Sequence, residues 1–128
     1  MKTTRTKVGL GGFTLVEIMI VIAIIGLLCA IAIPNYVRAR ASSQANACIN
    51  NLRELDSAIQ QFAIEQHKRV NDSVNFPDDL TPYIKLNSAG SIPPCPAGGT
   101  YSVNPVGANP SAQCSLGDTV TPAHVQNP

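Results

Sequence analysis

One uninterrupted apolar segment near the N-terminus constrains this chain more than any other feature. No polar or charged side chain occurs from Ile18 to Ile33. As an α-helix, residues 13–33 would extend roughly 32 Å at ~1.5 Å per residue, which matches a bilayer hydrocarbon core of ~30 Å. The segment therefore predicts a membrane-spanning helix, and taken alone it is also compatible with a simple signal-anchor.

The charge distribution around this segment is asymmetric. The first 12 residues contain Lys2, Arg5 and Lys7 and no acidic residue, and removing them changes the formal charge of the side chains from +1 to −2. A basic flank favours the cytoplasmic side of a membrane. Charges elsewhere are dilute and nearly balanced, which does not indicate nucleic-acid binding.

The pattern changes after Pro34, which cannot donate to the carbonyl of Ala30 and predicts a kink. Apolar residues then recur at alternating steps of four and three, which predicts an amphipathic helix with one buried face. They are Ala41, Ala45, Cys48, Leu52, Leu55, Ile59 and Phe62. Such a stripe could form a homodimeric coiled coil, but its small first residues favour packing on the chain's own domain.

The remainder of the chain is rich in turn-forming residues and has few apolar side chains. Residues 76–84 predict a short or irregular helix interrupted by Pro82. Residues 100–103 alternate like a strand, and residues 112–116 could form the returning strand. We therefore predict an α+β fold in which a long N-terminal helix packs on a small antiparallel sheet.

The junction before the apolar segment is the most informative motif. A secretory signal is cut behind its apolar stretch, whereas here the leader-like residues lie in front of it. The sequence Gly-Phe-Thr-Leu-Val-Glu at 12–17 resembles the processing signal of type IV prepilins and type II secretion pseudopilins. The resemblance implies cleavage between Gly12 and Phe13 by a prepilin peptidase, followed by N-methylation of Phe13.

Glu17 is an acidic residue at the start of an otherwise apolar helix. A carboxylate at a bilayer centre costs ~2.5–3.5 kcal/mol on insertion scales, and less near the interface. The amino group that cleavage creates on Phe13 is a candidate partner, either within one helix or between neighbouring subunits. The family resemblance favours the intersubunit pairing, which would set the axial register of a filament. It also implies that the helix between Gly26 and Pro34 melts during assembly, and both residues weaken a helix.

The four cysteines suggest a disulfide in the C-terminal part. Cys29 lies in the apolar segment and is expected to stay reduced. Cys95 and Cys114 flank the expected strand and its turn, and a bridge between them would be worth ~3 kcal/mol in the chain-entropy model. We favour that pair, although Cys48 could instead bridge to either of them.

No constellation of residues indicates catalysis, a cofactor or a metal site. No cysteine pair has the C-x-x-C spacing, and the Gly pairs do not form a phosphate loop. His67 and His124 are interpreted as solvated side chains. Asp118 alone is thin support for a calcium site of the kind found in major pseudopilins. A membrane-anchored enzyme would rest only on the unassigned C-terminal half.

We thus expect four regions: a leader at 1–12, a transmembrane and filament-core helix at 13–34, an amphipathic helix at 35–67 and a loop-rich β domain at 68–128. The expected function is a structural subunit, stored in the bacterial inner membrane and then polymerised through its N-terminal helix into an extracellular filament by an assembly platform. The alternatives are a type II secretion pseudopilin and a monomeric membrane-anchored binding module. The sequence does not distinguish motility, adhesion, DNA uptake, secretion or conduction.

Overall fold

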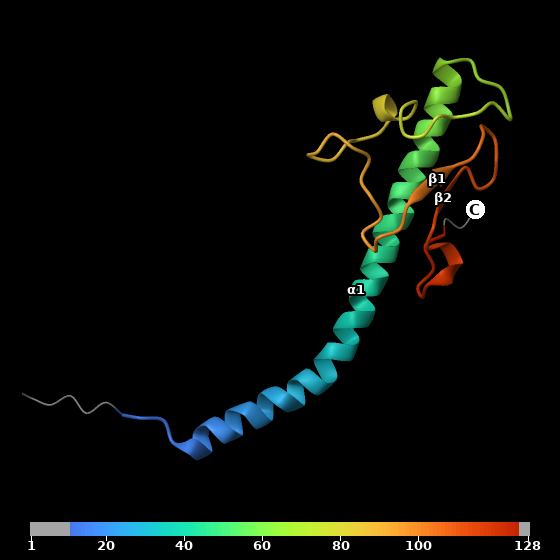
Figure 1. Ribbon diagram of the computed structural model, residues 1–128. Helices are drawn as coiled ribbons and strands as arrows, with labels where there is room; N and C mark the ends of the chain where they lie inside the picture. The colour runs from blue at the N-terminus through green and yellow to red at the C-terminus, as the bar shows by residue number, and fades with distance from the viewer. Residues whose placement is uncertain (1–10, 126–128) are drawn as a thin grey trace, which may run out of the picture. The chain divides into compact units, whose positions relative to one another are not determined.

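The computed structural model describes residues 11–125, so most of the leader at 1–12 and the last three residues lie outside it. One long helix, α1 (Leu15–Glu65), is followed by the short 3-10 helix η1 (Thr81–Tyr83), the strands β1 (Tyr101–Val103) and β2 (Ala112–Cys114), and the 3-10 helix η2 (Gly117–Thr119) (Figure 1). A long helix with a small antiparallel sheet confirms the predicted α+β, type IV pilin-like fold.

The chain divides into two compact units, one ending at Val37 and one beginning at Arg38. Among the residues of the first unit that the structure describes, 11–37, every large apolar side chain is exposed, from 46% at Val21 to 80% at Phe13. The helix that contains them is long and apolar enough to cross a membrane. Pro34 lies inside α1 and does not end it, while the kink expected there stays a prediction.

The second unit, which we call the head, is built on the C-terminal half of α1. The predicted stripe is confirmed from Ala45 to Phe62, with Ala58 added to its buried face, whereas Ala41 is only half-buried. Leu52 and Leu55 are almost completely enclosed. The apolar spacing of the sequence therefore determines which face of the helix carries the core.

The helix ends in a hydrogen-bonded turn after Glu65. His67 adopts a left-handed conformation (φ 51°), and the amide of Lys68 donates to the carbonyl of Ala63 at 2.9 Å. The amide of His67 donates to the carbonyl of Ile64 at 3.3 Å. This is the Schellman arrangement, in which a residue outside the helix satisfies carbonyls that have no intrahelical partner.

The expected hairpin is present. Strands β1 and β2 pair antiparallel, with Tyr101 opposite Cys114 and Val103 opposite Ala112. Ala112 and Cys114 face the core, and the hairpin lies beside the middle of the head's helix in Figure 1. The returning strand ends at Cys114 rather than Leu116, because Ser115 and Leu116 form a turn that leads into η2.

The segment after α1 supplies the remaining core contacts. Residues 76–80 form turns and lead into η1, which fits the predicted short or irregular helix. Leu80 from this segment is completely buried. Tyr83 packs edge-on against Phe62, with ring centroids 6.2 Å apart, and its hydroxyl donates to Glu65 at 2.8 Å. These contacts fasten a segment without regular structure to the end of α1.

The burial of Leu55 leads to a stability prediction. Leu55→Ala should lower the free energy of unfolding of the head by about 2–5 kcal/mol, because it leaves a cavity in the core. Ile64→Ala is the matched control, since Ile64 lies on the same helix and is 74% exposed, and it should change stability by less than about 0.5 kcal/mol. Denaturant titration of the detergent-solubilised chain measures both, and equal effects would contradict the assigned core.

Candidate functional site

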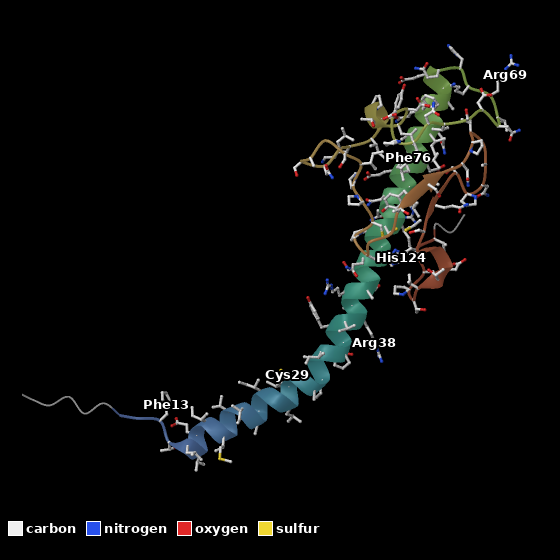
Figure 2. All side chains as sticks on the ribbon, in the orientation of Figure 1. Phe13, Cys29, Arg38, Arg69, Phe76 and His124 are labelled. Carbon is white, nitrogen blue, oxygen red and sulfur yellow. The ribbon has the colours of Figure 1, made fainter. Side chains whose placement is uncertain are left out.

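The predicted processing junction lies immediately in front of α1. Residues 11–14 have no regular secondary structure, and all are exposed. Phe13 is 80% exposed, and it is labelled at the N-terminal end of the helix in Figure 2. The bond between Gly12 and Phe13 is thus in an accessible, irregular segment that a peptidase could bind in extended form.

Thr14 caps the N-terminus of α1. Its side-chain oxygen accepts a hydrogen bond from the amide of Glu17 at 3.2 Å, and its carbonyl accepts one from the amide of Ile18 at 3.3 Å. Thr14 and Glu17 occupy the first and last positions of the Thr-x-x-Glu capping-box pattern. Our sequence interpretation missed this role for Thr14, although the pattern is visible in the printed sequence.

Glu17 therefore lies in the first turn of the helix, where it is exposed. A negative side chain at this position interacts favourably with the positive end of the helix dipole. Its position one turn from Phe13 agrees with the predicted proximity to the new amino group. Pairing between them stays a prediction.

Gly26 has no neighbouring atom within 4 Å of the position that a Cβ would occupy. Packing within this chain therefore does not require glycine there. Pro34 lies eight residues further along the same helix and removes an amide donor from it. The predicted weak stretch between Gly26 and Pro34 is consistent with both observations, but melting itself is not tested by them.

The cysteines have a different arrangement from the predicted one. All four are free thiols; Cys29 is exposed and the other three are buried. The Cys95–Cys114 bridge is therefore not confirmed. Instead, the ligand atoms of Cys48, Cys95, Cys114 and His124 all lie within 4.8 Å of one another.

The interpretation of His124 as a solvated side chain is wrong. Its side chain is only 3% exposed, and its Nδ1 atom lies 3.5 Å from the sulfur of Cys95. Its backbone amide donates to the carbonyl of Gly117 at 2.8 Å, which holds the segment in place after η2. No spacing rule links His124 to the three cysteines of the cluster. His67, the other histidine, is exposed, as we expected.

Polar neighbours surround the sulfur atoms of this cluster. The Tyr101 hydroxyl donates to the sulfur of Cys48 at 3.6 Å and accepts from the Asn51 side-chain amide at 3.0 Å. Burial raises the pKa of the Cys48 thiol to about 12. Burial also raises the pKa of the Tyr101 phenol, so that it remains a hydrogen-bond donor.

The turn after Cys95 is shaped around two of the sulfur atoms. Burial raises the pKa of the Cys95 thiol, but hydrogen bonds from the backbone of Ala97 and Gly99 and from the Cys48 and Cys114 thiols together lower the pKa overall. Gly98 has a positive φ of 87°, which favours glycine. A Cβ on Gly99 would stand 2.6 Å from the sulfur of Cys114, so only glycine allows this approach.

The comparisons with known proteins match the N-terminal part of the chain. Residues 11–33 match the family model described as the prokaryotic N-terminal methylation motif. The type IV major pilin protein PilA of Myxococcus xanthus is 43% identical over 75 residues, which are 59% of this chain and 34% of that protein. The type IV major fimbrial protein FimA of Dichelobacter nodosus is 44% identical over 57 residues, 44% of this chain and 36% of that protein.

A secretion protein is also similar. The type II secretion system core protein G of Escherichia coli is 28% identical over 86 residues, which cover 67% of this chain and 54% of that protein. No solved structure matches the chain. The matched part of the chain spans about a third to a half of the length of these relatives. The N-terminal part of this chain is thus similar to type IV pilins and to a type II secretion core protein, and it contains the N-terminal methylation motif.

The capping geometry leads to a prediction for Thr14. Thr14→Ala should destabilise the start of α1 by about 1 kcal/mol, because the Glu17 amide loses its acceptor. Amide hydrogen exchange at Glu17 and Ile18 in detergent micelles should accelerate about fivefold or more. Thr14→Ser keeps the hydroxyl and is the matched control; the same acceleration in Thr14→Ser would contradict the cap.

Proposed function

We propose that this chain is the precursor of a structural subunit of a type IV pilus-like filament. The observation that carries the proposal is an exposed apolar helix that begins at Leu15, inside the segment matched by the methylation motif at residues 11–33. A prepilin peptidase and methyltransferase would cut after Gly12 and methylate Phe13. The precursor would reside in the bacterial inner membrane, and an assembly platform there would deliver it to an extracellular filament.

The exposed surface of the first unit supports a membrane-embedded precursor that later becomes a filament subunit. Most of its described aliphatic side chains, such as Ile22 and Leu27, are more than half exposed, and water would solvate such a surface poorly. Lipid can cover it before assembly, and the helices of neighbouring subunits can cover it afterwards. The second exchange gains close packing rather than a new hydrophobic effect, because lipid is already apolar.

Cleavage would create a positive charge at the N-terminus of the apolar helix. The new amino group of Phe13 would stand near the Glu17 carboxylate of its own chain or of a neighbour. In an apolar filament core, an unpaired carboxylate is costly. The axial offset between neighbouring subunits that pairs the carboxylate with the amino group would therefore be the most stable one. Gly26 and Pro34 would let the intervening helix adjust to that offset.

A type II secretion pseudopilin is the second candidate. The similarity to core protein G supports it, since that match covers a larger share of this chain than the matches to the major pilins do. The two candidates share processing and helix-mediated assembly. They differ in whether the filament extends beyond the cell surface. Surface filaments detected by electron microscopy, and lost when the gene is deleted, would favour the pilin.

The processing proposal predicts the mature N-terminus. Mass spectrometry of the chain purified from its native membrane should find Phe13 as the first residue, with one methyl group on its amino nitrogen. Gly12→Glu should leave the precursor intact, because a charged side chain occupies the cleavage position. A mature chain that starts after residue 33 would rule out this processing.

The register proposal predicts a specific assembly defect for Glu17→Ala. The variant should be processed and stable in the membrane, yet the yield of sheared filaments should fall at least tenfold because the carboxylate partner is missing. Glu54→Ala is the matched control, since Glu54 is exposed on the same helix but lies in the head, and it should assemble normally. A normal filament yield from Glu17→Ala would refute the register role.

A further inference from the structure

Three thiols and one imidazole from four separate segments converge inside the head. Cys48 comes from α1, Cys95 from the turn before β1, Cys114 from the end of β2, and His124 from the segment after η2. We propose that these residues form a structural zinc site of the Cys3His type. The proposal concerns the head alone and does not depend on filament assembly.

The distances between the ligand atoms suit tetrahedral zinc. With Zn–S bonds of ~2.3 Å and Zn–N bonds of ~2.0–2.1 Å, the ligand atoms of a tetrahedral site are roughly 3.5–3.8 Å apart. The Cys95 sulfur and the His124 Nδ1 atom are 3.5 Å apart, and the four ligand atoms all lie within 4.8 Å of one another. A contraction of about 1 Å or less would therefore complete the coordination sphere.

Burial argues that the cluster is built for a ligand. Cys48, Cys95, Cys114 and His124 are 0%, 4%, 8% and 3% exposed. An imidazole and three thiols placed together in a small core would otherwise leave polar atoms with weak partners. A cation bound between them gives every one of these atoms a strong interaction.

Hydrogen-bond donors lie beside the sulfur atoms of the cluster. Metal-bound sulfur atoms carry negative charge and are commonly stabilised by hydrogen-bond donors around the ligands. Here the Tyr101 hydroxyl donates to Cys48 and is itself positioned by Asn51. Backbone donors at Ala97 and Gly99 face Cys95. The donors are thus in place for at least two of the three sulfur atoms.

The ligand set determines which metal fits. Calcium and magnesium require oxygen ligands, whereas three thiolates and one imidazole in a tetrahedral arrangement select zinc. Four protein ligands would close the coordination sphere and leave no position for water or substrate. The site is therefore structural and gives no reason to expect catalysis.

The protons and charges can be accounted for when zinc binds to this site. Three thiols release three protons to the solvent as Zn²⁺ binds, the imidazole coordinates in its neutral form, and the complete site has a net charge of −1. Protonation of the ligands at low pH consequently competes with the metal. No oxidant is needed, in contrast to a Cys95–Cys114 disulfide, which would require one and would leave Cys48 and His124 outside the bridge.

The first experiment measures metal directly on the unmodified chain. The mature protein is purified in detergent without chelators, and zinc is determined by inductively coupled plasma mass spectrometry together with a thiol count on the denatured, unreduced protein. We expect about one zinc per chain and four titratable thiols. Two thiols with no zinc would establish a disulfide and overturn the proposal, and four thiols with no zinc, even after incubation with zinc chloride, would overturn it equally.

Variants then test the ligand set. His124→Ala and Cys48→Ser should each reduce bound zinc at least fivefold, although neither change removes a cysteine of the predicted disulfide. Cys29→Ser is the matched control, because Cys29 is an exposed thiol outside the cluster, and its zinc content should equal that of the unmodified chain. Zinc retained in full by His124→Ala would remove the histidine from the site and overturn the Cys3His assignment.

Cobalt substitution keeps the test independent of variant folding. Co²⁺ added to the metal-free chain should give the intense visible absorption of tetrahedral cobalt with thiolate charge-transfer bands, and one equivalent of zinc should abolish it. A weak octahedral spectrum would contradict the site. His124→Cys should restore cobalt binding with a shifted thiolate spectrum, which separates loss of a ligand from loss of the fold.

Discussion

The apolar surface of the first unit must be covered, and this unit cannot cover it by itself. The rest of the structure depends on this constraint. The large side chains of the first unit remain exposed along the whole apolar segment, because a single helix has no second element to pack against. Only lipid or other chains can meet that requirement. The proposed cleavage before Phe13, the proposed pairing of Glu17 and the predicted weak stretch between Gly26 and Pro34 would all serve the transfer of this helix from lipid to a filament.

The head has the opposite constraint, because it has few apolar side chains with which to form a core. Its buried core consists of one helix face, Leu80, Cys95 and part of a two-stranded sheet, and small domains of this kind usually need an additional constraint. The convergence of Cys48, Cys95, Cys114 and His124 supplies the chemistry for one. A bound ion would connect all four segments, whereas a disulfide would connect only two.

Local sequence patterns predicted most of the regular structure. The period of the stripe identified the buried face of α1, and alternation with turn-forming residues identified both strands. The cluster could not be predicted in this way, because its ligands come from four segments whose spacing follows no local rule. His124 illustrates the difficulty: it lies in a coil-like tail, and only the tertiary fold shows that it is buried beside Cys95. Thr14 was different, since its capping pattern was legible in the sequence.

The position of Cys48 has a mechanical consequence. Ala45 and Cys48 are the first buried residues of α1, so a pulling force carried along the helix backbone would enter the head at this point. A side chain joined through a metal to the turn before β1, to β2 and to the C-terminal segment would distribute that load over the whole head instead of peeling the hairpin away strand by strand. The head would then yield as one body, at a force set by metal–sulfur bonds rather than by its thin apolar core.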